Sequence, residues 1–149
     1  MLSIVNNYEE DLQNIKERKI IIKDVNQQTP ELCLAGVKAY AWNILHIKEQ
    51  TPEICLEAVK GSATLYLVKE QTPEICLAAV KKDGLSIQYV TEQTPELCLE
   101  AVRENGWAVA YVKDQTLEIC VAALFDDLNV SDHFRDPLMK NKIKKAFGF

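Results

Sequence analysis

Apolar residues recur along most of the chain with a period of 21 or 22 residues. Counted from a threonine that begins each copy, apolar side chains stand at positions +3, +4, +5 and +8, and a small residue stands at +7. This spacing gathers the apolar side chains on one face of an α-helix. The five threonines are Thr29, Thr51, Thr72, Thr94 and Thr116.

A shorter apolar pattern follows in each copy, with two residues three apart before the next threonine. Val109 and Val112 are an example, and Ile87 and Val90 precede them in the same register. The spacing predicts a second helix of about two turns. Each threonine is a good N-cap and is followed in most copies by proline, which suits the first helical position. The segments "KKDG" and "RENG" predict the end of the first helix, with Gly106 at a positive φ.

Two other interpretations of the repeat are open from the sequence. The segments "LSIQYV" and "WAVAYV" could be strands, and a 22-residue period also suits leucine-rich repeats. Leucine-rich repeats need alternating leucines closed by an asparagine, which are absent here. The pattern therefore favours an all-α fold, a short α-solenoid of helix-turn-helix repeats.

The repeat register extends to both ends of the chain, so we predict a single repeat domain over residues 1–149 with terminal caps. Residues 1–27 keep Ile15, Ile22 and Val25 in register but are polar elsewhere, as an N-terminal capping repeat should be. Five repeats follow, and a C-terminal capping helix is predicted over residues 137–149. The repeats span 28–49, 50–70, 71–92, 93–114 and 115–136.

Two of the repeats resemble a known family. The segments are "EICLAAVKKDGLSIQYV", Glu74 to Val90, and "ELCLEAVRENGWAVAYV", Glu96 to Val112. They are similar to a family of short helical repeats classed as domain of unknown function 4116. The resemblance covers the five central units, although "KGSATLYLV" is one residue short and "KAYAWNIL" lacks the glycine. It implies an α-helical repeat, and it implies no activity and no site residues.

Charge and hydropathy limit the classes of partner. The formal net charge of −5 argues against nucleic acid, which binds to a dense basic face. No apolar run approaches the ~18 residues of a membrane span, and the first residues do not resemble a signal peptide. We therefore expect a cytoplasmic protein that binds neither membrane nor nucleic acid.

Five cysteines stand at position +4 of successive repeats, namely Cys33, Cys55, Cys76, Cys98 and Cys120. Equivalent positions of stacked helices lie about 8–10 Å apart, which exceeds the Cα separation of a disulfide and spreads the sulfurs too widely for one zinc ion. We predict free, mostly buried thiols in a reducing compartment, with no metal and no cofactor.

No catalytic motif is evident. The two histidines, His46 and His133, lack partners nearby in the sequence, and phosphate-binding, zinc-protease and nucleophile-elbow patterns are absent. The glutamates at position +2 suit helix N-termini, where they interact favourably with the helix dipole. We therefore predict that the protein is not an enzyme.

Aromatic and histidine side chains recur in the second helix at positions that vary between copies, while the core positions do not. A varied face of a repeat protein is either the rim of the core or a partner-binding ridge. Trp107 and Tyr111, four apart, are expected to contact the same ligand. The candidate binding residues are Trp42, His46, Tyr66, Tyr89, Trp107 and Tyr111.

The sequence favours a monomeric, non-catalytic scaffold for protein or peptide interaction, with the partner unidentified. Two alternatives stay open. One is a purely structural or self-assembling repeat module, and the other is an enzyme whose site is not recognisable from the sequence.

Overall fold

The computed structural model describes residues 7–62 and 64–148. Residues 1–6 of the predicted N-terminal cap, and Ala63, lie outside the described residues. The contacts divide the chain into two compact units, Met1–Glu70 and Gln71–Phe149, and this division falls on the predicted boundary between two repeats. The prediction of a single domain over the whole chain stays a prediction.

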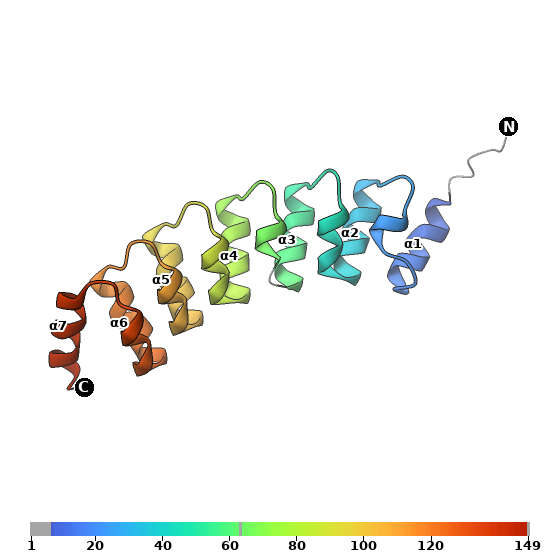
Figure 1. Ribbon diagram of the computed structural model, residues 1–149. Coiled ribbons are helices and arrows are strands. Elements are labelled where there is room, and N and C mark those ends of the chain that lie inside the picture. Colours follow the sequence, from blue (N-terminus) through green and yellow to red (C-terminus); the bar gives the residue numbers. More distant parts are fainter. Residues whose placement is uncertain (1–6, 63, 149) are drawn as a thin grey trace. The chain divides into compact units, whose positions relative to one another are not determined.

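The fold is all-α and repeat-like, and no strand occurs in the part of the chain that the structure describes (Figure 1). The segments considered as possible strands are 3-10 helices. The first unit contains α1 (Tyr8–Lys16), η1 (Ile22–Asp24), α2 (Pro30–Ala39), η2 (Ala41–His46), α3 (Pro52–Gly61) and η3 (Leu65–Leu67). The second contains α4 (Pro73–Lys82), η4 (Gly84–Tyr89), α5 (Pro95–Glu104), η5 (Gly106–Tyr111), α6 (Leu117–Asp126), η6 (Leu128–His133) and α7 (Pro137–Phe147).

Each repeat is therefore an α-helix followed by a 3-10 helix, whereas the expected placement of Trp107 and Tyr111 assumed that the second helix is α-helical. In a 3-10 helix residues three apart eclipse each other, which explains why the second apolar pair is spaced by three. Val109 and Val112 are fully buried, as are Val102 and Ala101 of the preceding α-helix.

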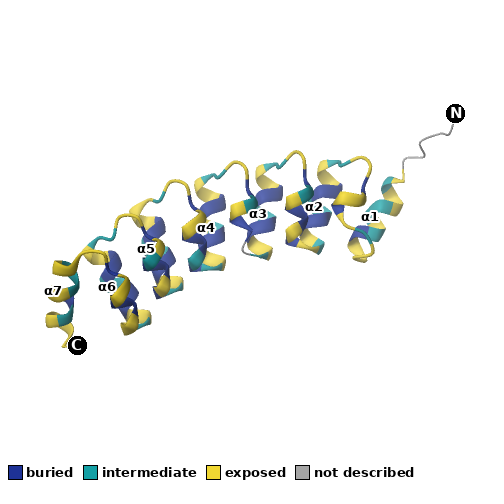
Figure 2. Cartoon of the chain, viewed as in Figure 1, coloured by how far each residue is buried: buried dark blue, intermediate teal, exposed yellow. Residues whose placement is uncertain are grey.

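Within each unit the α-helices form one layer and the 3-10 helices form the other. Each of η2, η4 and η5 packs against its own α-helix and against the α-helix of the next repeat. The facing sides of the two layers are buried, and the outer sides are exposed (Figure 2). The residue at position +5 was expected to widen the core face, but none of the five is buried. Leu77 is 40% exposed, and Leu34, Leu56, Leu99 and Val121 are half-buried.

The predicted start of each α-helix is confirmed. The hydroxyl of Thr94 accepts a hydrogen bond from the Leu97 N–H at 3.2 Å, and Pro95 is the first helical residue. The other four threonines cap their helices in the same way at 3.3 Å.

The prediction that the first helix of the repeat ends at Gly106 with a positive φ is wrong. Among the described residues only Arg18 and Gly148 have a positive φ, so Gly106 does not. The chain leaves α5 through extended Asn105, at φ −157° and ψ 110°, whose side chain accepts a hydrogen bond from the Trp107 N–H at 3.0 Å. Asn105 is thus the N-cap of the 3-10 helix η5, and Gly106 does not end α5 in a left-handed conformation. Asn and Asp at an N-cap favour extended backbone.

Gly106 is required for a different reason, which is close approach of two backbones. A Cβ on Gly106 would stand 2.6 Å from the carbonyl oxygen of Ala123 on α6, and one on Gly84 would stand 2.4 Å from that of Ala101. Gly61 has a different environment, since it is the last residue of α3 and an added Cβ there would meet that of Ala41 at 3.1 Å.

Four of the five glutamines that precede the threonines connect successive repeats, which the sequence did not reveal. The amide NH2 of Gln93 donates to the carbonyl oxygens of Ile87 at 3.0 Å and Tyr111 at 3.1 Å. Its Oε1 accepts from the Lys113 N–H at 2.8 Å. One side chain therefore satisfies backbone groups in two successive repeats. The same bridge is made by Gln28, Gln50 and Gln115.

Candidate interaction surfaces

The six candidate binding residues all lie on the 3-10 helices, and none of them is fully buried. The exposed fractions of the five aromatic side chains fall between 40% and 44%, and His46 is half-buried. Core residues of the same 3-10 helices, such as Ile44 and Val109, are 0% exposed. The structure therefore places the candidates at the surface, and their role as binding residues stays a prediction. They are Trp42, His46, Tyr66, Tyr89, Trp107 and Tyr111.

Trp107 and Tyr111 do not share one face of η5 as expected. The expectation assumed an α-helix, where residues four apart are separated by roughly 40°. In a 3-10 helix of three residues per turn, the same spacing corresponds to about 120°. The two side chains therefore point in different directions, although both are exposed.

Trp107 instead forms a cluster with two residues of the next repeat, which the sequence analysis missed. The His133 ring meets the Trp107 ring edge to face, with centroids 5.1 Å apart, and the indole N–H donates to Asp127 Oδ2 at 3.1 Å. We call Trp107, Asp127 and His133 the tryptophan cluster. The available signal was the register, because His133 occupies the position of Tyr111 one repeat later.

A related pair occurs in the first unit. The Trp42 and Tyr66 rings meet edge to face with centroids 5.9 Å apart, again from successive 3-10 helices. Such pairs contribute about 0.5–1.5 kcal/mol beyond buried area, so they hold the aromatic side chains in fixed positions on the surface.

The five cysteines are free and buried, as predicted. Burial raises the pKa of every one of these thiols, and burial together with the Asp136 carboxylate raises the pKa of Cys120 to about 11. The Cys98 thiol donates weakly to Gln93 Oε1 at 3.8 Å, which joins the cysteine position to the glutamine bridge. A thiol with a raised pKa is a poor nucleophile at neutral pH.

We expect the thiols to react slowly with an aromatic disulfide reagent at neutral pH while the protein is folded. Denaturant should expose all five at once, because each lies in the core of its repeat. The measurement is a time course of thiol titration with and without denaturant, with free glutathione as the fast control. Rapid reaction of any thiol in the folded protein would contradict this prediction.

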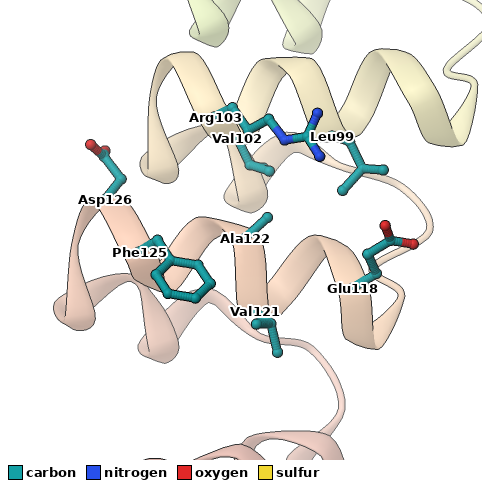
Figure 3. Close-up of a pocket in the computed structure, with 8 residues that line it drawn as sticks. All are labelled: Leu99, Val102, Arg103, Glu118, Val121, Ala122, Phe125 and Asp126. Atoms are coloured by element: carbon teal, nitrogen blue, oxygen red, sulfur yellow. The ribbon is translucent and has the colours of Figure 1, made fainter.

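A groove on the outer side of the second unit is the other candidate surface. It is an open groove between α5 and α6 with a volume of about 460 Å³ (Figure 3). Its lining is mostly apolar, with charged side chains at the rim. The lining residues are Leu99, Val102, Arg103, Glu118, Val121, Ala122, Phe125 and Asp126.

The family comparison covers the part of the second unit that holds Trp107 and the α5 side of the groove, and it ends at Leu117, the first residue of α6. Residues 72–117 match DUF4116, a domain of unknown function. The predicted resemblance is thereby confirmed for this segment. The DUF4116 segment contains α4, η4, α5 and η5, with Gly84, Gly106 and the glutamine bridge of Gln93. Neither curated proteins nor solved structures give a match to the chain.

The described residues also bear on whether the chain could bind a metal ion or span a membrane. Within residues 7–62 and 64–148, no group of three or more histidine, cysteine, aspartate or glutamate side chains is placed to hold a metal ion. In the same residues, no helix has the length and apolar character needed to cross a membrane.

Proposed function

We propose that this chain is a monomeric, non-catalytic scaffold of a reducing intracellular compartment that binds a protein or peptide segment through the exposed aromatic residues of its 3-10 helices. The observation that carries the proposal is the tryptophan cluster. Trp107 is 42% exposed although its own repeat buries the neighbouring Ala108 completely. Its orientation is fixed by the Asp127 hydrogen bond and the His133 ring.

Such a residue is well suited to bind a partner. Tryptophan and tyrosine dominate interface hot spots, because they bury a large area and have few rotamers to lose. A side chain that is already held in place loses less entropy on binding. The core needs only the apolar pair of each 3-10 helix, so the exposed positions are free to vary with the partner.

The absence of catalysis is part of the proposal. It is supported by the raised pKa values of the thiols and by the lack of a nucleophile beside a base in the sequence pattern. His133 packs its ring against Trp107, which is a structural role for the side chain.

The test is selection from a random peptide library displayed on phage, with the intact chain as the immobilised target. Peptides that the wild-type chain enriches are synthesised, and their binding is measured by isothermal titration calorimetry. Trp107→Ala should weaken binding by about 2 kcal/mol or more, which is roughly a 30-fold rise in Kd.

Phe125→Ala is the matched control for the selection, since it removes an exposed aromatic ring from the outer groove instead. It should leave binding of the same peptides unchanged. Circular dichroism must first show that both variants fold. If no peptide is enriched, or if Trp107→Ala binds as wild type does, the 3-10 helices are not the binding face.

A further inference from the structure

On the outer side of the second unit, the helix pairs α4–α5 and α5–α6 differ in one pair of positions. Between α4 and α5, Lys81 at position +9 of one repeat forms an ion pair with Glu100 at position +6 of the next, with Nζ and Oε1 3.8 Å apart. This pair spans the outer side of the two helices.

Between α5 and α6 the equivalent pair is incomplete. Arg103 takes the register of Lys81, but Ala122 stands where the register places Glu100. In the part of the chain that the structure describes, the side chain of Arg103 makes no ion pair or hydrogen bond. Figure 3 shows its guanidinium extending over the groove above Ala122, beside Leu99. The result is an unpaired cation above an apolar hollow.

The residue at position +9 of the following repeat, Phe125, makes the groove more apolar. Phe125 replaces the cation of the earlier repeats and is 82% exposed, the largest exposed fraction among the large apolar side chains described. Its ring stands on α6 beside Ala122 and near Val121 (Figure 3). The volume of the open groove, about 460 Å³, lies within the roughly 300–1,000 Å³ of ligand pockets.

We propose that the groove between α5 and α6 is a docking site for an amphipathic helix of a partner protein. The helix places an apolar side chain against Phe125 and Val121, and a carboxylate one turn away pairs with Arg103. A helix fits because the groove runs between two neighbouring helices, the geometry of helix-in-groove recognition. A carboxylate fits because the arginine fork binds it bidentately, and because the neighbouring helix pair α4–α5 already pairs a cation with a glutamate.

One charged neighbour works against this pairing. Glu118 lines the same groove without an ion pair to Arg103, and its carboxylate repels a second one nearby. Asp126 also lines the groove, but its Oδ2 accepts a hydrogen bond from the Gly106 N–H at 2.8 Å. The site therefore selects a single, well-placed carboxylate, and it does not select a strongly acidic segment.

The proposal does not rest on the aromatic face of the 3-10 helices, and its test is independent. The probe is a hydrocarbon-stapled helical peptide with leucine and glutamate four residues apart on one face. The staple is needed because short isolated helices are marginal in water. The control peptide carries glutamine in place of the glutamate, and binding to the full chain is measured by fluorescence anisotropy.

We expect the glutamate peptide to bind wild type at least about 10-fold more tightly than the glutamine peptide, because only the carboxylate forms a charge-assisted pair. Arg103→Gln should remove that preference. Ala122→Glu places a carboxylate beside Arg103 in the register of Glu100 and should weaken binding by about 10-fold or more. Glu118→Gln should strengthen it, and Trp107→Ala should leave it unchanged.

Four outcomes would overturn the proposal. They are no binding of the glutamate peptide, equal binding of the two peptides to wild type, unchanged binding to Ala122→Glu, and loss of binding in Trp107→Ala. The last would place the peptide on the 3-10 helices instead. Because Arg103, Glu118 and Ala122 lie outside the buried core, thermal unfolding should show all three variants folded.

Discussion

Replacing Gly106 with valine is expected to lower the free energy of unfolding by about 3 kcal/mol. The added side chain meets the Ala123 carbonyl oxygen at 2.6 Å and the Asp126 Cβ at 3.0 Å. Both atoms belong to a packed helix, so the backbone of η5 must move away, and overpacking of this kind costs about 1–3 kcal/mol. The movement also endangers the hydrogen bond from the Gly106 N–H to Asp126. Urea denaturation followed by circular dichroism measures the change.

Asparagine at Gly106 distinguishes the two explanations for this glycine. A left-handed backbone would tolerate asparagine better than alanine. Close approach predicts that Gly106→Asn and Gly106→Ala are both destabilising, since each adds a Cβ. Gly61→Ala is the control, because its added Cβ meets only that of Ala41 at 3.1 Å and should cost less. An asparagine variant as stable as wild type would restore the left-handed explanation.

Replacing Gln93 with glutamate is expected to cost about 2–3 kcal/mol at neutral pH. The carboxylate still accepts from the Lys113 N–H, but it cannot donate to the carbonyl oxygens of Ile87 and Tyr111. Two hydrogen bonds of about 1 kcal/mol each are lost, and oxygens now face oxygens. In urea denaturation the variant should unfold at a lower midpoint concentration, while the dependence of the unfolding free energy on urea concentration stays unchanged.

Gln88→Glu is the matched control, because Gln88 is exposed and donates one hydrogen bond, to the Leu85 carbonyl at 3.0 Å. It should change the free energy of unfolding by less than about 1 kcal/mol. If the two variants are equally stable, the glutamine bridge does not hold successive repeats together.

Much of the fold could be predicted from the sequence because each repeat encodes it locally. The threonine and proline at each helix start fix the N-terminus, and the spacing of Leu97, Cys98, Ala101 and Val102 defines one buried face. The spacing of three between the apolar pair of the second helix is the one feature of the sequence that agrees with its 3-10 type. The buried cysteines follow from the same helical face.

The candidate surfaces were only partly predictable. The exposed aromatic residues were found from their variation between copies, but the α-helical spacing assigned to Trp107 and Tyr111 was wrong. The tryptophan cluster joins residues 20 and 26 positions apart in sequence, which no local pattern reports. The groove depends on Arg103 and Ala122 of successive helices, and it becomes visible only when the two helices are placed side by side.

The sequence by itself determined the period, the helical class and the buried face, because helix capping and apolar spacing act within about ten residues. Tertiary structure decided what the repeated glycine and glutamine do. Gly106 is required because α6 passes close to it, and Gln93 is required because its amide forms hydrogen bonds with backbone groups of two neighbouring 3-10 helices. Both depend on distances between repeats, and the sequence of a single repeat does not specify how closely its neighbour packs.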